Sequence, residues 1–341
     1  MEDSSTQDSL VLDQLQVLSL AEGFFQSSVL FALLRAGVFE IIGEGAASST
    51  ELAERLGARP ETLARLLNAG VALKTLESED GLLFRTPESL RSVLLPNSTS
   101  YLGDWLLNLE YFRDAFAHLD EAVLTSSPVA AFLEDAQGEQ KRTRQFTLAM
   151  HNYAVLRGRE LVHFLDTTGC HTLLDVGAGP GTYSFHLAEA NPDLQLYLAD
   201  VPEVLEVARD VATSFRISKP VTYLGVDLRV DDIEGAFDII LVSNTFHMLG
   251  EAESRRLLSR LYPLVSHGGS LVVQAQYLND NRLGPRWPVL LDLIQLCITE
   301  SGRNHTVGET KLWLEEAGFT DVEYCPMTLV NTNSFLRGWK R

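Results

Sequence analysis

The segment Leu173–Asp200 constrains the fold of this chain more than any other. It has the pattern of an apolar strand, a glycine turn, an amphipathic helix and a second strand that ends on an acid. Gly177, Gly179 and Gly181 remove side chains where the backbone must turn sharply and approach a ligand. Asp200 follows the second strand, where a doubly wound sheet presents a carboxylate to a ribose hydroxyl. The segment therefore predicts a nucleotide-type site.

The glycine spacing separates two kinds of cofactor. A dinucleotide fingerprint, G-x-G-x-x-G, needs its third glycine at the position of Thr182. The chain has G-x-G-x-G instead, preceded by Asp175. Glycines can also serve only a tight turn between strand and helix, but the order of elements around them favours a binding site.

Charge and cysteine content narrow the partners. With 341 residues the chain can hold two domains, and its net charge of −19 would repel nucleic acid and anionic membranes. We expect no run of membrane-spanning length, and the N-terminus MEDSSTQDSL lacks the features of a secretory signal. The cysteines are far apart, so we expect no metal, free thiols and a cytoplasmic protein; they are Cys170, Cys297 and Cys325.

Four regions follow from composition and periodicity. We expect a disordered tail over 1–10, a winged-helix dimerisation domain over 11–100, a helical connector over 101–165 and an α/β domain over 166–341. The connector has a polar break near 136–141.

The first domain begins with an apolar helical run. The residues Leu18–Ile42 are too apolar for one small domain to cover, so they predict an obligate homodimer. The segment 49–86 has the order helix, helix, hairpin, with Ser49 or Thr50 as the first helix cap, Gly57 as its stop and Pro60 opening the second helix. This pattern is typical of winged helices.

A winged helix can bind DNA. Near the second helix, however, the basic side chains are Arg59 and Arg65, and the chain is strongly acidic. An interaction domain is the favoured interpretation.

Strands alternate with helices from residue 172 onward, which predicts a Rossmann-like, doubly wound sheet. The last two strands, on either side of Asn331-Thr332, should form an antiparallel edge. The predicted strands are 172–176, 195–199, 221–226, 237–243, 269–275, 322–330 and 333–339.

From about residue 12 to its end, the chain resembles the two-domain S-adenosylmethionine (SAM) dependent O-methyltransferases, such as the caffeate and acetylserotonin enzymes. The glycine turn with its acid is similar to their motif I. The stretches that carry the resemblance are 49–86, QFTLAMHNY at 145–153, LLDVGAGPG at 173–181, GVDL at 225–228, SNTFHMLGEAESRRLLSRLYPLVSHGGSLVV at 243–273 and LWLEEAGFTDVEY at 312–324.

The resemblance implies a seven-stranded sheet with its last strand antiparallel, and SAM as cofactor, leaving as S-adenosylhomocysteine. It also implies a small aromatic acceptor from secondary metabolism, and a homodimer whose N-terminal domain helps to close the partner's active site. For the cofactor, it implies that the acid and glycines of the turn lie under the methionine moiety.

Further cofactor roles follow from the same resemblance. Asp200 should accept from the ribose hydroxyls, with Val201 beside the adenine. Asp227 should meet the adenine amino group, and Leu228 should pack on the ring. Ser243 replaces a lysine of the plant enzymes. Each acid could instead be merely solvated.

His247 is the candidate general base. It lies just past the apolar strand FDIILVSN, at the carboxyl edge where ligands bind in such sheets, and it occupies the position of the family's catalytic histidine. A phenol with a pKa of about 10 is mostly neutral at pH 7, so a base is useful, and an ordinary histidine base predicts a rising limb near pH 6–7. The alternative is a structural histidine at a strand–helix junction.

Two departures from the family weaken this assignment. The family's His-Asp-Trp is His-Met-Leu here, at 247–249, and the glutamate that orients the histidine is replaced by Ala275 between two glutamines. A second acid of the plant enzymes falls near Asn304, with His305 beside it. The base could be weaker, the acceptor more acidic, or the reaction different.

The acceptor wall is expected on two helices. The resemblance places Phe146 and Met150 on one of them, although an aromatic and a methionine at this spacing are common in cores. The second helix presents an apolar face with one amide, suited to a flat acceptor: Trp287, Leu291, Ile294 and Gln295.

The leading hypothesis is methylation of a phenolic or enolic hydroxyl. Missing acids leave open a C- or N-methyltransferase, or a SAM-binding enzyme that does not methylate, such as a hydroxylase or cyclase. A non-enzymatic winged-helix regulator is disfavoured by the acidity and by the intact glycine turn.

Overall fold

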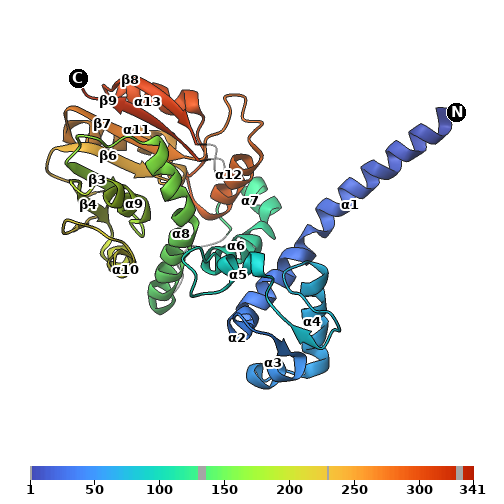
Figure 1. Ribbon diagram of the computed structural model, residues 1–341. Helices are drawn as coiled ribbons and strands as arrows, with labels where there is room; N and C mark the ends of the chain where they lie inside the picture. The colour runs from blue at the N-terminus through green and yellow to red at the C-terminus, as the bar shows by residue number, and fades with distance from the viewer. Residues whose placement is uncertain (1, 130–135, 229, 328–332) are drawn as a thin grey trace. The chain divides into compact units, whose positions relative to one another are not determined.

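The computed structural model describes residues 2–129, 136–228, 230–327 and 333–341 (Figure 1). The chain forms two compact units, Met1–Glu110 and Tyr111–Arg341. The division falls inside helix α6 (Gly103–Phe116), so the connector that we expected as a separate region over 101–165 belongs mostly to the C-terminal unit.

The N-terminal unit is helical with a small two-stranded sheet. Its core gathers large apolar side chains, among them Leu33, Phe39, Leu52 and Phe84. Its elements are α1 (Glu2–Arg35), α2 (Val38–Ile42), β1 (Ala47–Ser48), α3 (Ser49–Leu56), α4 (Pro60–Ala72), β2 (Leu83–Phe84) and α5 (Glu88–Leu94).

Helix α1 departs from two expectations. Residues 2–10, expected to be disordered, belong to the helix, which begins at Glu2. The expectation of no membrane-length run is wrong: by length and composition Leu12–Arg35 could cross a membrane. Polar residues interrupt the apolar residues of this segment, so no continuous apolar run of that length is visible in the sequence. Within one chain the helix exposes Phe24 and Phe25, as a surface that a second subunit covers would.

The winged-helix pattern is present, with changes in detail. The side chain of Ser48, rather than Ser49 or Thr50, caps α3 in a capping box with Glu51. Gly57 ends that helix in the left-handed conformation, and Pro60 opens α4. The expected hairpin is reduced to a bridge between residues 77 and 85, because β2 pairs with the unexpected strand β1.

The C-terminal unit is built on a seven-stranded sheet with helices on both faces (Figure 1). The sheet is parallel except for its last strand, β9, which runs antiparallel to both of its neighbours. The expected doubly wound architecture is thus confirmed, while the turn at Asn331-Thr332 lies outside the described residues. In spatial order the strands are β5 (Thr222–Gly225), β4 (Gln195–Asp200), β3 (Thr172–Val176), β6 (Phe237–Ser243), β7 (Val265–Ala275), β9 (Ser334–Trp339) and β8 (Thr320–Pro326).

Strand alternation divides the core into two apolar layers. In β6, Ile240 and Val242 face one layer, while Ile239 and Leu241 face the other. The polar stretch 136–141, expected as a break, is the start of a long helix, in keeping with the high helix propensity of the residue types Gln, Glu and Lys. The remaining helices are α7 (Leu119–Thr125), α8 (Ala136–Phe164), α9 (Thr182–Ala190), α10 (Pro202–Ala212), α11 (Glu251–Leu261), α12 (Arg286–Ile298) and α13 (Val307–Glu316).

Candidate active site

The three glycines of the turn after β3 differ in their surroundings: two are packed against neighbouring side chains and one is open. All three glycines have positive φ, of 69°, 54° and 72° for Gly177, Gly179 and Gly181. A Cβ on Gly177 would lie 2.6 Å from Oγ1 of Thr245, and one on Gly181 would lie 2.6 Å from the Phe185 ring. At Gly179 no neighbouring atom lies within 4 Å of that position. Two glycines therefore permit close packing, and the third leaves bare backbone that a ligand can approach.

Asp200 is held in place at the end of β4. One carboxylate oxygen accepts from the backbone N–H of Gly179 and the other from that of Val201, each at 2.8 Å. Burial raises the pKa of Asp200, and the two backbone hydrogen bonds oppose the shift. Because a carboxylate can accept about four hydrogen bonds, the fixed group keeps capacity for further donors.

Asp175 is buried, with 2 % of its surface exposed, beneath the same turn. The hydroxyl of Ser184, on α9, donates to its Oδ2 at 2.5 Å, and this joins β3 to the following helix. Burial raises the pKa of Asp175 to about 7, the Ser184 bond lowers it and the Asp200 charge raises it further. Within the described part of the chain, Oδ1 has no hydrogen-bond partner.

The predicted adenine residues follow β4 and the neighbouring strand β5. Val201 is partly exposed, and Leu228 packs partly buried against the sheet core. The N–H of Asp227 donates to Oδ2 of Asp231 at 2.8 Å, which fixes a turn after β5. On β6, Ser243 donates to Gln274 at 3.0 Å. These positions share one edge of the sheet.

His247 lies on a short 3-10 helix, η1 (Phe246–Met248), that follows β6. Asn244 makes the turn between them with a φ of 52°, a left-handed conformation that asparagine tolerates better than most residues. The imidazole is half-buried, and among the described residues its buried Nδ1 has no hydrogen-bond partner. Burial, and to a smaller extent His305, lowers the pKa of His247 to about 4.

Ala275 ends β7 on the face that carries Phe246, Tyr277 and Trp313. An acid at this position would share that face with the turn that bears His247. Alanine leaves the face apolar, and an apolar surrounding disfavours the charged imidazole.

The glutamines beside Ala275 serve other contacts. Gln274 accepts from Ser243, and Gln276 donates to the hydroxyl of Tyr153 on α8 at 2.6 Å. Asn304, in place of the second acid, is also occupied. Its side chain donates to the carbonyl of Pro288 at 2.6 Å and so anchors α12.

The predicted acceptor helices are present. Phe146 and Met150 lie half-buried on α8. On α12, Leu291, Ile294 and Gln295 are buried, and Trp287 is half-buried. Oε1 of Gln295 is buried without a hydrogen-bond partner in the described chain.

Sequence reasoning missed the residues that join these parts. Thr245 contacts the glycine turn, Ser184 holds Asp175, and His305 contacts the backbone around His247. Ser184 lies nine residues from Asp175, whereas Thr245 and His305 contact segments that are distant in sequence. No pattern of spacing could have paired them.

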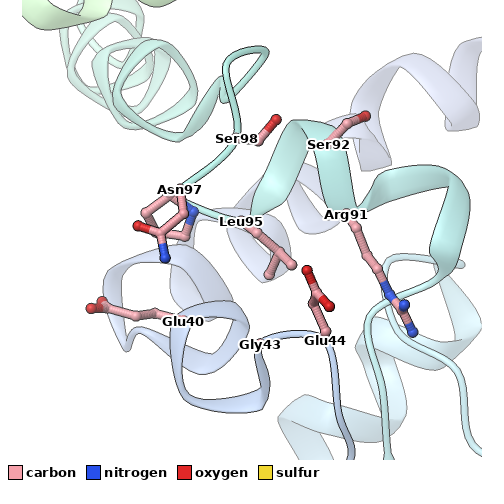
Figure 2. A pocket seen from close by; sticks show the side chains of 9 residues that line it. Glu40, Gly43, Glu44, Arg91, Ser92, Leu95, Asn97 and Ser98 are labelled. Atoms are coloured by element: carbon pink, nitrogen blue, oxygen red, sulfur yellow. The ribbon is translucent and has the colours of Figure 1, made fainter.

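A separate cavity of about 540 Å³ opens in the N-terminal unit (Figure 2). Its polar lining mixes carboxylates with a guanidinium and includes none of the predicted site residues: Glu40, Gly43, Glu44, Arg91, Ser92, Leu95, Pro96, Asn97 and Ser98. Over the residues that the structure describes, no cluster of His, Cys, Asp or Glu could hold a metal ion.

Comparison with known proteins agrees with this architecture. The chain matches the model of the O-methyltransferase domain over residues 110–320 and that of the O-methyltransferase dimerisation domain over 18–89. It is 26% identical to a 3-hydroxy-5-methyl-1-naphthoate 3-O-methyltransferase of Streptomyces sahachiroi, over 94% of each chain. It is 29% identical to a phenazine-1-carboxylate N-methyltransferase of Pseudomonas aeruginosa, over 89% of this chain and 91% of the relative.

A solved structure shares the fold. The human N-acetylserotonin methyltransferase in complex with SAM superposes with a TM-score of 0.85 at 22% identity, over 96% of this chain and 97% of the other.

Proposed function

The chain belongs to the O-methyltransferase family, and from that premise we propose that it methylates a phenolic or enolic hydroxyl of a small aromatic secondary metabolite. It is a SAM-dependent enzyme. The observation that carries the proposal is the contact between Gly177 and Thr245, because it brings the glycine turn against the turn that bears His247. Methyl donor and proton acceptor would thus share one edge of the sheet.

The residues at this edge fit SAM. Open backbone at Gly179 leaves space for the methionine moiety, and the fixed carboxylate of Asp200 has acceptor capacity for the ribose hydroxyls. Asp227 would meet the adenine amino group, with Val201 and Leu228 beside the ring. When bound, SAM supplies an electrophilic methyl group and leaves as S-adenosylhomocysteine.

The acceptor would lie against α8 and α12. Apolar side chains suit a flat ring, and the buried carbonyl oxygen of Gln295 would accept a hydrogen bond from a polar substituent. The wall that we propose consists of Phe146, Met150, Trp287, Leu291, Ile294 and Gln295.

His247 would accept the proton of the acceptor hydroxyl. With a pKa lowered to about 4, its ring is neutral at pH 7 and able to accept a proton. Since Nδ1 is buried, Nε2 is the nitrogen left for the acceptor, and Nδ1 must then hold the hydrogen of the neutral ring. A base of this strength suits a hydroxyl more acidic than a simple phenol, and it moves the expected rising limb from pH 6–7 to about pH 4.

The dimerisation domain supports a homodimer. We propose further that the partner's N-terminal unit helps to close the acceptor site, as the family resemblance implies, and that the enzyme works in the cytoplasm with no nucleic acid and no membrane partner.

Methyl tracing tests the proposal. Purified protein is incubated with SAM carrying a deuterated methyl group and with panels of phenols, enols and amines, and products are analysed by mass spectrometry. We expect label on oxygen, and His247→Ala to lower turnover about 100-fold, the lower end of general-base contributions, while SAM affinity by calorimetry stays within twofold. Intact SAM binding without labelled product from any panel would refute the proposed activity.

N-methylation is the second candidate. The observation in its favour is the apolar face at Ala275, because a neutral amine already carries its lone pair and needs no base before attack. One relative named above is an N-methyltransferase. Label on nitrogen together with a small effect of His247→Ala would favour this candidate.

A further inference from the structure

A second histidine contacts the turn that carries His247. The imidazole nitrogen Nε2 of His305 lies 3.1 Å from the carbonyl oxygen of Phe246 and 3.1 Å from that of Leu249. These two carbonyls bracket η1 on either side of His247. Carbonyl oxygens only accept hydrogen bonds, so Nε2 must carry the hydrogen and donate to both.

The chain around His305 is built against the same turn. A Cβ on Gly302 would lie 2.7 Å from the carbonyl oxygen of His247, so this glycine is what permits the two backbones to touch. Ser301 donates to Glu253 at 2.6 Å, and Glu253 also accepts from the N–H of Gly250 at the end of the turn. Gly302 and His305 thus contact the turn 246–250 directly, and Ser301 is joined to it through Glu253.

His305 itself is held from several sides. It is 4% exposed, and its ring lies edge-on to Trp313, with 4.8 Å between the ring centres. Its own carbonyl accepts from the N–H of Leu278 at 3.0 Å. Burial lowers the pKa of His305, which keeps the ring neutral, and a neutral ring with hydrogen on Nε2 cannot be an ion-pair partner for an imidazolium.

We propose that His305 is a positioning residue for His247, fixing the 3-10 turn through its backbone carbonyls where the family uses acids to orient the imidazole itself. This inference rests on the proposed function of His247. The device differs in kind from an acid: it sets the place of the base without adding charge, which agrees with the apolar face around Ala275. The rate of methyl transfer would then depend more on the alignment of His247 with the acceptor than on a raised basicity of its imidazole.

Kinetics of a small set of variants test the proposal. We expect His305→Ala to lower kcat about tenfold through misalignment, with SAM Kd within twofold. His305→Gln keeps an N–H donor and should recover much of the loss. His267→Ala, at an exposed histidine on β7, is the matched control and should leave kcat unchanged.

A double-mutant cycle separates positioning from general structure. If His305 acts through His247, adding His305→Ala to His247→Ala lowers kcat no further. Fully additive losses, or a Gln variant as poor as the Ala variant, would overturn the proposal.

Nitrogen-15 NMR of the histidine rings gives a readout that needs no turnover. We expect hydrogen on Nε2 of His305 from pH 5 to 8, and a His247 resonance that changes in His305→Ala and returns toward its wild-type position in His305→Gln. Hydrogen on Nδ1 of His305, or a His247 signal that stays unchanged in His305→Ala, would overturn the inference even if no acceptor were found. Failure of methyl transfer with the expected NMR result would instead count against the proposed function alone.

Discussion

The proposed donor and acceptor halves of the site are built by different means. In the donor half, backbone geometry does most of the work: three left-handed glycines and a carboxylate fixed by two backbone N–H groups, those of Gly179 and Val201. In the proposed acceptor half, segments that are distant in sequence meet at the turn that bears His247, and the positions where the family resemblance implied acids hold Ala275 and Asn304. Local backbone geometry leaves little freedom to vary, whereas assembled side chains can change with the acceptor.

This contrast suggests that the two halves respond to different perturbations. Changes at the glycine turn or at Asp200 should alter SAM affinity. Changes at the dimer surface or around His247 should alter turnover.

Breaking the dimer should damage the acceptor half alone. Phe24 and Phe25 on α1 are 54% and 58% exposed, and charges there would oppose burial by a second subunit. We expect the double variant Phe24→Glu/Phe25→Glu to become monomeric and to lose turnover about 100-fold through a misplaced acceptor, with SAM Kd within twofold. Light scattering, calorimetry and steady-state kinetics measure the three quantities.

The matched control for that variant is Leu82→Glu. Leu82 is 66% exposed at the turn of the winged-helix hairpin, away from the apolar helix in sequence. The Leu82→Glu variant should stay dimeric and active. A stable monomer of the wild-type protein at micromolar concentration, or full activity in the monomeric variant, would contradict the prediction.

Removing the ribose carboxylate should damage the donor half alone. A hydrogen bond to a charged group is worth roughly 1.5–3 kcal/mol, so Asp200→Ala should raise the SAM Kd about 10- to 150-fold. Asp200→Asn keeps the shape and should be intermediate. Wild-type SAM affinity by calorimetry in the Ala variant would show that this acid does not meet the ribose.

The donor half was also the more predictable from sequence. Strands β3 and β6 lie where the apolar runs predicted them, and the glycine turn joins strand to helix as expected. Both carry a local signal, an apolar run or a glycine spacing, that can be read directly from the sequence. For the same reason Gly57 and Pro60 end and begin their helices as predicted.

What the sequence could not show depends on contacts across the fold. His305 reaches the carbonyl of Phe246 from a segment that is distant along the chain. The two-residue strand β1 exists only because β2 pairs with it. The low pKa of His247 follows from its burial in the folded chain and, to a smaller extent, from His305. The low basicity of this histidine was therefore not readable from its motif.

Alanine substitutions at two glycines of the turn should have different effects, one mainly on stability and the other mainly on SAM binding. Gly181→Ala would place a Cβ 2.6 Å from the Phe185 ring at a φ of 72°, so we expect a loss of unfolding free energy of about 2–4 kcal/mol. Gly179→Ala meets open space and should cost only the strain of its positive φ, about 1 kcal/mol. Its larger effect should be on SAM, with Kd raised about tenfold because the methyl group occupies ligand space. Thermal unfolding measures the stability of both variants, and calorimetry measures their SAM affinity. If Gly179→Ala binds SAM as tightly as the wild type does, SAM does not contact the backbone at Gly179.

Restoring an acid at position 275 should move the base toward the family's chemistry. A carboxylate on the face that carries Phe246 would favour the charged form of the imidazole, so Ala275→Glu should raise the pKa of His247 from about 4 toward its ordinary value of 6.5. The sign follows from the charges: with a raised pKa, His247 is protonated over a wider range of low pH and becomes a stronger base above it. We expect the rising limb of kcat/KM to move upward by one to two pH units, which is about that pKa change, and turnover at pH 7.5 to change only a few-fold.

The control is Ala275→Gln, whose side chain has nearly the same shape as that of Ala275→Glu without the charge. It should leave the limb near pH 4, which separates electrostatics from crowding. Titration of the His247 ring by NMR gives the same pKa without an acceptor. If the Glu and Gln variants titrate alike, position 275 does not act on His247, and the low basicity of this histidine has another source.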